Sequence, residues 1–274
     1  MTRNTKALIP LLAALALACI AVVAATGGKP DGRSKILLIG KDPDHPHGTH
    51  MYMLTCEKLA MCLELTTGVD AVVSNGWPTD EKTLEGVKTI VIYTDPAAER
   101  ILDGPGAKKF EAMMKDGVGL VTIHWASSVY EKNLERLGGR WKGYLGGTWV
   151  SNVGIHTNRS QLEQLIPEHP VCRGWKPHEL HDEYYLKPSI GSGKPLLQVK
   201  APEDEVVVGW VHERAGGGRA FGTTLGHFYR NFQQADFRRM IVNGILWSAH
   251  VKVPEAGAPV TLSEEDLALP PQQG

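Results

Sequence analysis

The sequence has little cysteine and no excess of charge of either sign. Its 274 residues contain 4 Cys, and 29 Lys and Arg against 30 Asp and Glu give a formal net charge of −1. A chain without a basic excess offers no electrostatic reason to bind nucleic acid, so we expect no nucleic-acid partner. Beyond the first 25 residues only Cys56, Cys62 and Cys172 remain. An odd number, two of them on one predicted helix, argues against disulfides and favours buried thiols.

Short motifs of known mechanism are also missing. The chain has no GxGxxG, Walker loop, HExxH or GxSxG element, and no internal repeat. The sequence therefore predicts no nucleotide cofactor, and it shows no nucleophile for an ester or amide hydrolase. What it does contain is 11 His, most of them gathered in a few short stretches.

The first 25 residues have the pattern of a signal peptide. Arg3 and Lys6 precede an apolar stretch over residues 8–23, and small residues stand before Thr26. The apolar stretch is short for a membrane span, and Pro10 interrupts it. We expect an exported protein, periplasmic or extracellular, with a linker over residues 26–34. In the alternative, Cys19 carries a lipid anchor, which would be the protein's only link to a membrane.

Apolar segments bounded by turn residues predict an α/β fold. Strands are expected over 35–40, 69–73, 87–93 and 119–123, with helices over 49–67, 106–116 and 233–249. This order indicates a mainly parallel sheet with helices on both faces, in one domain over residues 35–250. Further strand-like segments cover 183–186, 196–199, 206–211 and 219–225, and residues 251–274 form an extended or disordered tail.

Three histidines follow predicted strands directly or through a short loop. His124 ends the strand over 119–123, His227 follows the strand over 219–225, and His50 ends the loop after the first strand. Because the carboxyl ends of parallel strands share one edge of a sheet, we expect these side chains in one crevice. The predicted helix over 49–67 places His50 in a first turn, where the helix dipole favours a neutral ring. The alternative for His124 is a core histidine bonded to backbone.

Other polar and aromatic residues are candidates for the same crevice. Glu183 is the expected base or oxygen ligand, whereas Asp182 fits a charged turn. His156 is a candidate metal ligand or, alternatively, an exposed loop histidine; for His45 and His47 a functional role and a solvated turn stay equally open. The expected substrate-binding residues are Trp125, Trp149, Tyr184 and Arg230.

The chain from about residue 35 to 249 resembles the ThuA-like, or trehalose utilisation, family. The matching features are the loop running to His50, residues 119–124, 146–149 with His156, Glu183-Tyr184, 224–227 and 244–247. The resemblance implies a flavodoxin-like fold similar to class I glutamine amidotransferases, and a link to sugars, including oxidised keto-sugars. Where an amidotransferase carries its cysteine nucleophile, this chain has His124, so we expect no glutaminase activity.

Together these features predict an exported enzyme acting on a sugar or keto-sugar by isomerisation, epimerisation, elimination or hydrolysis. His124, Glu183 and His50 are the expected catalytic residues. In one version a divalent metal, zinc first, is held by His50, His124, His156 and His227. In the other version a histidine and Glu183 act as acid and base without metal. The alternative is a non-catalytic carbohydrate-binding or cell-envelope protein, and a homo-oligomer is left open.

Overall fold

Five parallel strands form one half of the main sheet in the computed structural model, which describes residues 1, 32–151 and 153–272. They are β1 (Ser34–Gly40), β2 (Val69–Asn75), β3 (Val87–Ile92), β4 (Gly119–Ile123) and β12 (Arg219–Thr223). Their spatial order is β2-β1-β3-β4-β12. In chain order this is 2-1-3-4-5, the flavodoxin-like arrangement. The predicted α/β fold is confirmed.

Antiparallel strands extend the sheet beyond β12. They are β11 (Glu205–Glu213), β10 (Lys194–Lys200), β7 (Ile155–Gln164) and β8 (His178–Tyr185), in that order. A smaller sheet joins β5 (Ser128–Tyr130), β6 (Gly147–Ser151) and β9 (Ser189–Ile190). The sheet is thus mixed, and its antiparallel half includes a strand, β7, that the sequence pattern does not predict.

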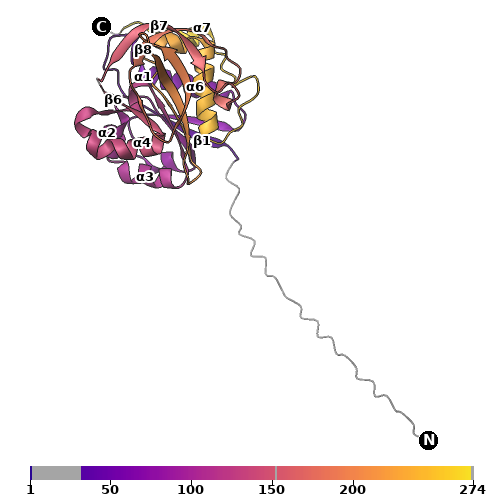
Figure 1. The fold of residues 1–274 in the computed structure, drawn as a ribbon. Coiled ribbons are helices and arrows are strands. Elements are labelled where there is room, and N and C mark those ends of the chain that lie inside the picture. Colours follow the sequence, from indigo (N-terminus) through magenta and orange to yellow (C-terminus); the bar gives the residue numbers. More distant parts are fainter. Residues whose placement is uncertain (2–31, 152, 273–274) are drawn as a thin grey trace. The chain divides into compact units, whose positions relative to one another are not determined.

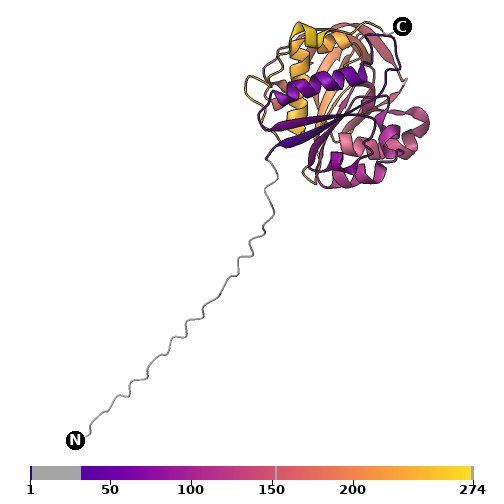
Figure 2. The same cartoon turned by 180° about the vertical axis from the view of Figure 1, so that it is seen from behind.

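Helices cover both faces of the sheet, as predicted (Figures 1 and 2). Two of them, α1 (Tyr52–Glu64) and α6 (Ala235–Ser248), bury their apolar side chains in one core. On the other face, α2 (Ala97–Leu102), α3 (Ala107–Lys115) and α4 (Gly139–Leu145) enclose a second core. Short helices α5 (Tyr229–Phe232) and α7 (Glu264–Leu267) follow later in the chain. Strands covered on both faces are apolar throughout, which explains their unbroken hydrophobic runs.

The first helix begins later than predicted. It starts at Tyr52 with Met51 as its N-cap, and no side chain caps it. Thr49 instead pairs as an isolated β-bridge with Phe228, and its hydroxyl donates to the Pro46 carbonyl at 2.5 Å. Pairing with a distant loop therefore overrides the local capping signal, and His50 lies outside the helix.

The C-terminal tail is extended and packed against α6 rather than disordered. Val253, Ala258 and Val260 are buried. The Arg238 guanidinium donates to the Val260 carbonyl at 3.0 Å, and the Asn243 amide oxygen accepts from the Ala258 N–H at 2.8 Å. Apolar residues spaced along the tail therefore fill the outer edge of the core.

The described residues from Arg33 onward form one compact unit. Cys56, Cys62 and Cys172 are free and buried within it, as predicted. Within the described ranges, no helix is long and apolar enough to cross a membrane. The predicted signal peptide with Cys19, and most of the linker, lie outside the described residues.

Candidate functional site

Three histidines and a glutamate converge at the carboxyl edge of the parallel strands. His50 follows β1, His124 follows β4, His227 follows β12, and Glu183 comes from β8. One nitrogen or oxygen atom of each lies within 4.8 Å of all the others. The topology that brings strand ends to one edge thus assembles residues 177 positions apart (227 − 50) into one cluster.

The spacing of these atoms suits a four-coordinate metal ion. His124 Nε2 lies 3.0 Å from His50 Nε2, 3.3 Å from His227 Nδ1 and 3.5 Å from Glu183 Oε2. His227 Nδ1 and Glu183 Oε2 are 3.3 Å apart. Four ligand atoms at the usual zinc bond lengths are about 3.3 Å from each other in a tetrahedron. The cluster therefore has the dimensions of a zinc-like coordination shell.

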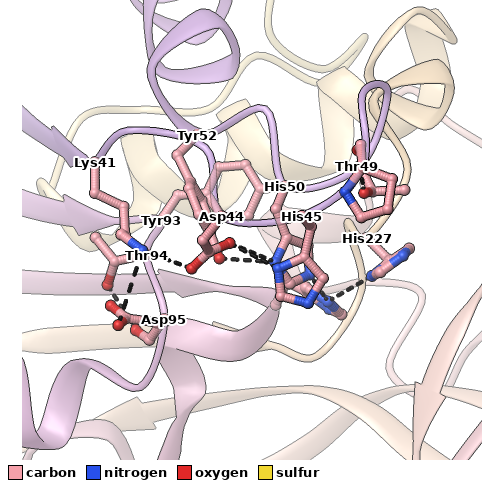
Figure 3. Close-up of polar contacts among 12 residues, drawn as sticks. Lys41, Asp44, His45, Thr49, His50, Tyr52, Tyr93, Thr94, Asp95 and His227 are labelled. Atoms are coloured by element: carbon pink, nitrogen blue, oxygen red, sulfur yellow. Dashed lines mark hydrogen bonds and ion pairs between the residues drawn. The ribbon is translucent and has the colours of Figure 1, made fainter.

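Neighbouring groups orient the rings so that bare nitrogens face the cluster. His124 Nδ1 donates to the Thr224 carbonyl at 2.7 Å, which leaves the lone pair on its Nε2. The Tyr185 hydroxyl lies 2.9 Å from the same Nε2, at the rim of the cluster. On the far side of His50, Nδ1 contacts the Tyr52 hydroxyl at 2.8 Å and Asp44 at 3.4 Å (Figure 3). Such outer partners fix the tautomer of a metal-binding histidine.

Electrostatics favour a neutral His50 ring beside an ionised Glu183 carboxylate. Burial lowers the pKa of His50 far below its ordinary value, and the charges of His124, His45 and His227 lower it further. Burial raises the pKa of Glu183, but hydrogen bonds with His124 and His227 outweigh it, so the net pKa is well below the ordinary range. The helix dipole expected to act on His50 is not the cause, because the residue precedes α1.

The backbone holds two of the histidines in an uncommon conformation. His50 and His124 have φ of 47° and 56°, a left-handed region that β-carbons disfavour. The His50 N–H donates to the His227 carbonyl at 3.0 Å, and the Tyr229 N–H donates to Gly48 at 2.9 Å. This pairing ties the loop after β1 to the loop after β12 and fixes the rings relative to each other. Such outliers gather at functional sites.

A buried carboxylate fixes the backbone of the loop after β12 and of β8 by hydrogen bonds. Asp182 is fully buried, and it accepts N–H bonds from Gly226 at 2.7 Å, His227 at 3.0 Å and Glu183 at 2.9 Å. Burial raises its pKa, while His124 and the three backbone bonds oppose that rise. The sequence interpretation of Asp182 as part of a charged turn is therefore wrong, because β8 points this residue inward.

A small cavity opens onto the cluster. Its lining consists of His45, His50, Trp125, Trp149, Ile155, Glu183 and Tyr185. The Trp149 indole stacks on the Tyr185 ring, with centroids 3.9 Å apart and planes at 16°. Both tryptophans thus lie where they were expected, and together with Tyr185 they form aromatic walls beside polar groups.

Three predicted site residues lie elsewhere. His156 is outside the metal-ligand cluster, and Glu183 takes its place. Side chains alternate along a strand, so Ile155 lines the cavity while His156 and its cross-strand partner Tyr184 point to the opposite face. Tyr184 is buried in the core. Arg230 does not line the cavity; its guanidinium stacks on Phe228 and bonds His181 at 2.5 Å.

The sequence did not indicate Tyr185 or Ile155 as cavity residues, and it left the role of His45 open. Tyr185 was passed over for Tyr184, and only the register of β7 with β8 decides between them. For His45 the signal was present, since a carboxylate precedes it, but the sequence could not show on which side of the loop the ring lies.

Comparison with models of protein families shows to which family the chain belongs. The model of the ThuA family, described as trehalose utilisation, matches residues 45–248. The chain belongs to the ThuA family. The match spans every residue of the histidine cluster, so the cluster lies inside the family domain.

Solved structures agree with the ThuA fold. A ThuA-like protein of Bacteroides uniformis has a TM-score of 0.59 at 18% identity, over 80% of this chain and 93% of its own. Two cytoplasmic proteins of Salmonella typhimurium follow. The first has a TM-score of 0.57 at 15% sequence identity, and the match covers 78% of this chain and 99% of that protein. The second has a TM-score of 0.52 at 12% sequence identity, and the match covers 78% of this chain and 98% of that protein. Comparison with curated proteins gave no match.

Proposed function

We propose that this ThuA protein is an exported, metal-dependent enzyme that acts on a sugar or keto-sugar. The observation that carries the proposal is the cluster of His50, His124, His227 and Glu183 at a cavity with aromatic walls. Neutral imidazoles are ligands that zinc and other divalent transition metals prefer. The cavity gives a small molecule access to the same point.

The donor set fits a catalytic rather than a structural metal. Structural zinc sites are closed by four protein ligands, whereas catalytic sites use three and leave one position open. We therefore assign the three histidines as the ligands, and Glu183, which lines the cavity beside them, as an unbound carboxylate next to the open position. When bound, the ion would polarise a substrate oxygen. Glu183, held ionised, would then accept or return a proton at that oxygen.

The substrate class rests on the cavity walls and on the family. Trp125, the partly exposed aromatic ring of the cavity lining, offers a flat apolar surface on which a sugar ring stacks. The family description names trehalose utilisation. A polarised carbonyl beside a proton acceptor suits a keto-sugar, on which isomerisation, epimerisation or elimination all begin with removal of a proton next to the carbonyl. Hydrolysis is the other reaction that such a centre supports.

Export is the second part of the proposal. It rests on the basic and apolar pattern of the first 25 residues. N-terminal sequencing of the protein recovered from the periplasm or medium tests it. We expect a mature chain that begins at Thr26; a chain retained in cells with its leader intact would contradict export, and a lipid on Cys19 would establish the anchored form.

Metal analysis tests the centre directly. We expect about one divalent ion per purified chain, removable by a chelator, with turnover of a keto-glycoside panel lost and regained as the metal is removed and restored. His227→Gln, at a partly exposed ligand, should lose the ion and the activity. His250→Gln, at an exposed position just after α6, should retain both. Purified protein without metal, and without uptake of added zinc, would contradict the proposal.

The competing function is carbohydrate binding without catalysis, which the tryptophan walls also favour. The same panel separates the two. Sugars that bind tightly but are never converted, with His227→Gln changing affinity alone, would establish a binding protein.

A further inference from the structure

Asp44 and His45 form a carboxylate–imidazole pair on the loop after β1, next to the histidine cluster. His45 Nδ1 lies 2.7 Å from Asp44 Oδ1, and the other carboxylate oxygen accepts from the Lys41 ammonium at 2.5 Å (Figure 3). The ammonium is also 3.9 Å from Asp95, on the loop after β3. Two strand-end loops therefore hold the carboxylate in place.

This arrangement sets the tautomer of the His45 ring. One oxygen of Asp44 faces the Lys41 ammonium and the other faces His45 Nδ1, so the carboxylate is held between a cation and the ring. An ionised carboxylate only accepts hydrogen bonds, so Nδ1 of His45 must carry the hydrogen. In the neutral ring, Nε2 then has the free lone pair.

The ring is placed to use that lone pair on a substrate. It lies against His50, with centroids 3.7 Å apart, and edge-on to Trp125 at 5.6 Å. It lines the cavity together with Glu183, and its side chain is 33% exposed. Among the described residues, Nε2 of His45 has no hydrogen-bond partner. The ring is thus oriented by protein on one side and open to the cavity on the other.

We propose that His45, oriented by Asp44, is the residue that transfers the proton at the substrate carbon, while Glu183 serves the substrate oxygen. The inference rests on the proposed function. His45 Nε2 takes a proton from the carbon next to the keto-sugar carbonyl; the C–H bond breaks, and its electron pair moves to give an enolate. The Asp44 carboxylate stabilises the imidazolium. In isomerisation the ring returns the proton to the former carbonyl carbon, while the proton of the neighbouring hydroxyl passes to the former carbonyl oxygen. In elimination the enolate re-forms the carbonyl, a C=C bond forms as the C–O bond to the leaving group breaks, and the ring protonates the departing oxygen, so no further reactant is needed.

A second metal ion is the competing use of these residues, since Asp44, His45 and His50 also lie close enough to share one. Two contacts count against it. The Lys41 ammonium occupies one oxygen of Asp44, and the Tyr52 hydroxyl occupies Nδ1 of His50. A cation beside an ammonium would be repelled, so the geometry favours proton transfer.

The experiment compares His45→Ala with His47→Ala, an exposed histidine on the same loop, in the metal-loaded protein. Turnover of the keto-glycoside panel and metal content are measured for each. We expect His45→Ala to keep the ion of the wild type and to lose about 100-fold or more in kcat. Added imidazole should restore part of the kcat of His45→Ala. Asp44→Asn should lower kcat while retaining the metal, and His47→Ala should match the wild type.

Three outcomes would overturn the inference. Unchanged kcat in His45→Ala would exclude His45 as the proton-transfer residue while leaving the metal-dependent function intact. Two ions per wild-type chain, with one lost in His45→Ala, would establish the second metal site instead. A wild type that binds no metal and converts no sugar would overturn the proposed function, and this inference with it.

Discussion

At the residue scale, the cluster depends on side chains that never touch a substrate. Asp182 lies beneath the loop of His227 and next to Glu183, and each of its hydrogen bonds is to a backbone N–H. A carboxylate can accept all three, whereas an amide cannot present two acceptor atoms. Replacing it leaves buried donors unsatisfied, which costs about 1–3 kcal/mol.

Asp182→Asn tests this role. We expect a lower free energy of unfolding by about 1–3 kcal/mol in urea denaturation, and metal affinity weaker by about 10- to 100-fold, as for outer partners of metal ligands. Asp116→Asn, at an exposed site after α3, is the control and should change neither. Normal metal affinity in Asp182→Asn would show that the carboxylate does not position the ligands.

At the element scale, the packing of α6 against β12 positions the strand that leads to His227. Gly244 of α6 faces Phe221 of β12, and a β-carbon at Gly244 would lie closer than contact distance to that ring. The close approach brings the helix down onto the strand that leads to His227. Glycine is needed here for space rather than for an unusual backbone angle.

Gly244→Ala should therefore destabilise the protein by about 1–3 kcal/mol, because the buried phenyl ring must shift. Gly143→Ala in α4 is the matched control, since a β-carbon there meets nothing within 4 Å. That change should stabilise by up to about 1 kcal/mol through helix propensity. Thermal melts of both variants provide the comparison, and equal shifts would refute the packing argument.

At the scale of the whole molecule, acid should weaken the fold. Burial lowers the pKa of His169 to about 4 and that of His50 further. In the unfolded chain the pKa of a histidine is about 6.5. Below that pH the unfolded chain therefore binds more protons than the folded protein, and the free energy of unfolding decreases as the pH is lowered. Hydrogen bonds that outweigh burial depress the pKa of Asp44 and Glu183, and these contributions are lost below about pH 4. The raised pKa of Asp182 acts in the opposite direction.

Urea unfolding of chelated protein at pH 7, 6 and 5 measures the effect. We expect the free energy of unfolding to fall with pH, and to fall less steeply in His169→Asn. Asparagine can still accept the Val171 N–H that His169 Nδ1 accepts at 3.2 Å. One such ring contributes at most about 1.4 kcal/mol per pH unit, and less here because it is half-buried. Parallel pH profiles for wild type and variant would contradict the role of His169.

Several parts of the site were predictable because their signals are local. His124 and His227 end apolar strands, and parallel strand ends share an edge, so their proximity follows from the sequence pattern. The predictions for His156 and Tyr184 were wrong because side chains alternate between the two faces of a strand, and both residues lie on the face away from the cavity. The pairing of β7 with β8 that sets this alternation was not predicted. The start of α1 was also wrong, because the bridge from Thr49 to Phe228 joins residues far apart in the chain.

The sequence by itself determined the α/β fold, the apolar strands and the edge at which the histidines stand. These depend on hydrophobic periodicity and turn residues, which act over a few neighbouring positions. Only the tertiary structure decided that Glu183 rather than His156 joins the histidines, that Tyr185 lines the cavity, and that Asp44 orients His45. Each of these depends on register and loop pairing between distant segments, where a shift of one residue turns a side chain to the other face.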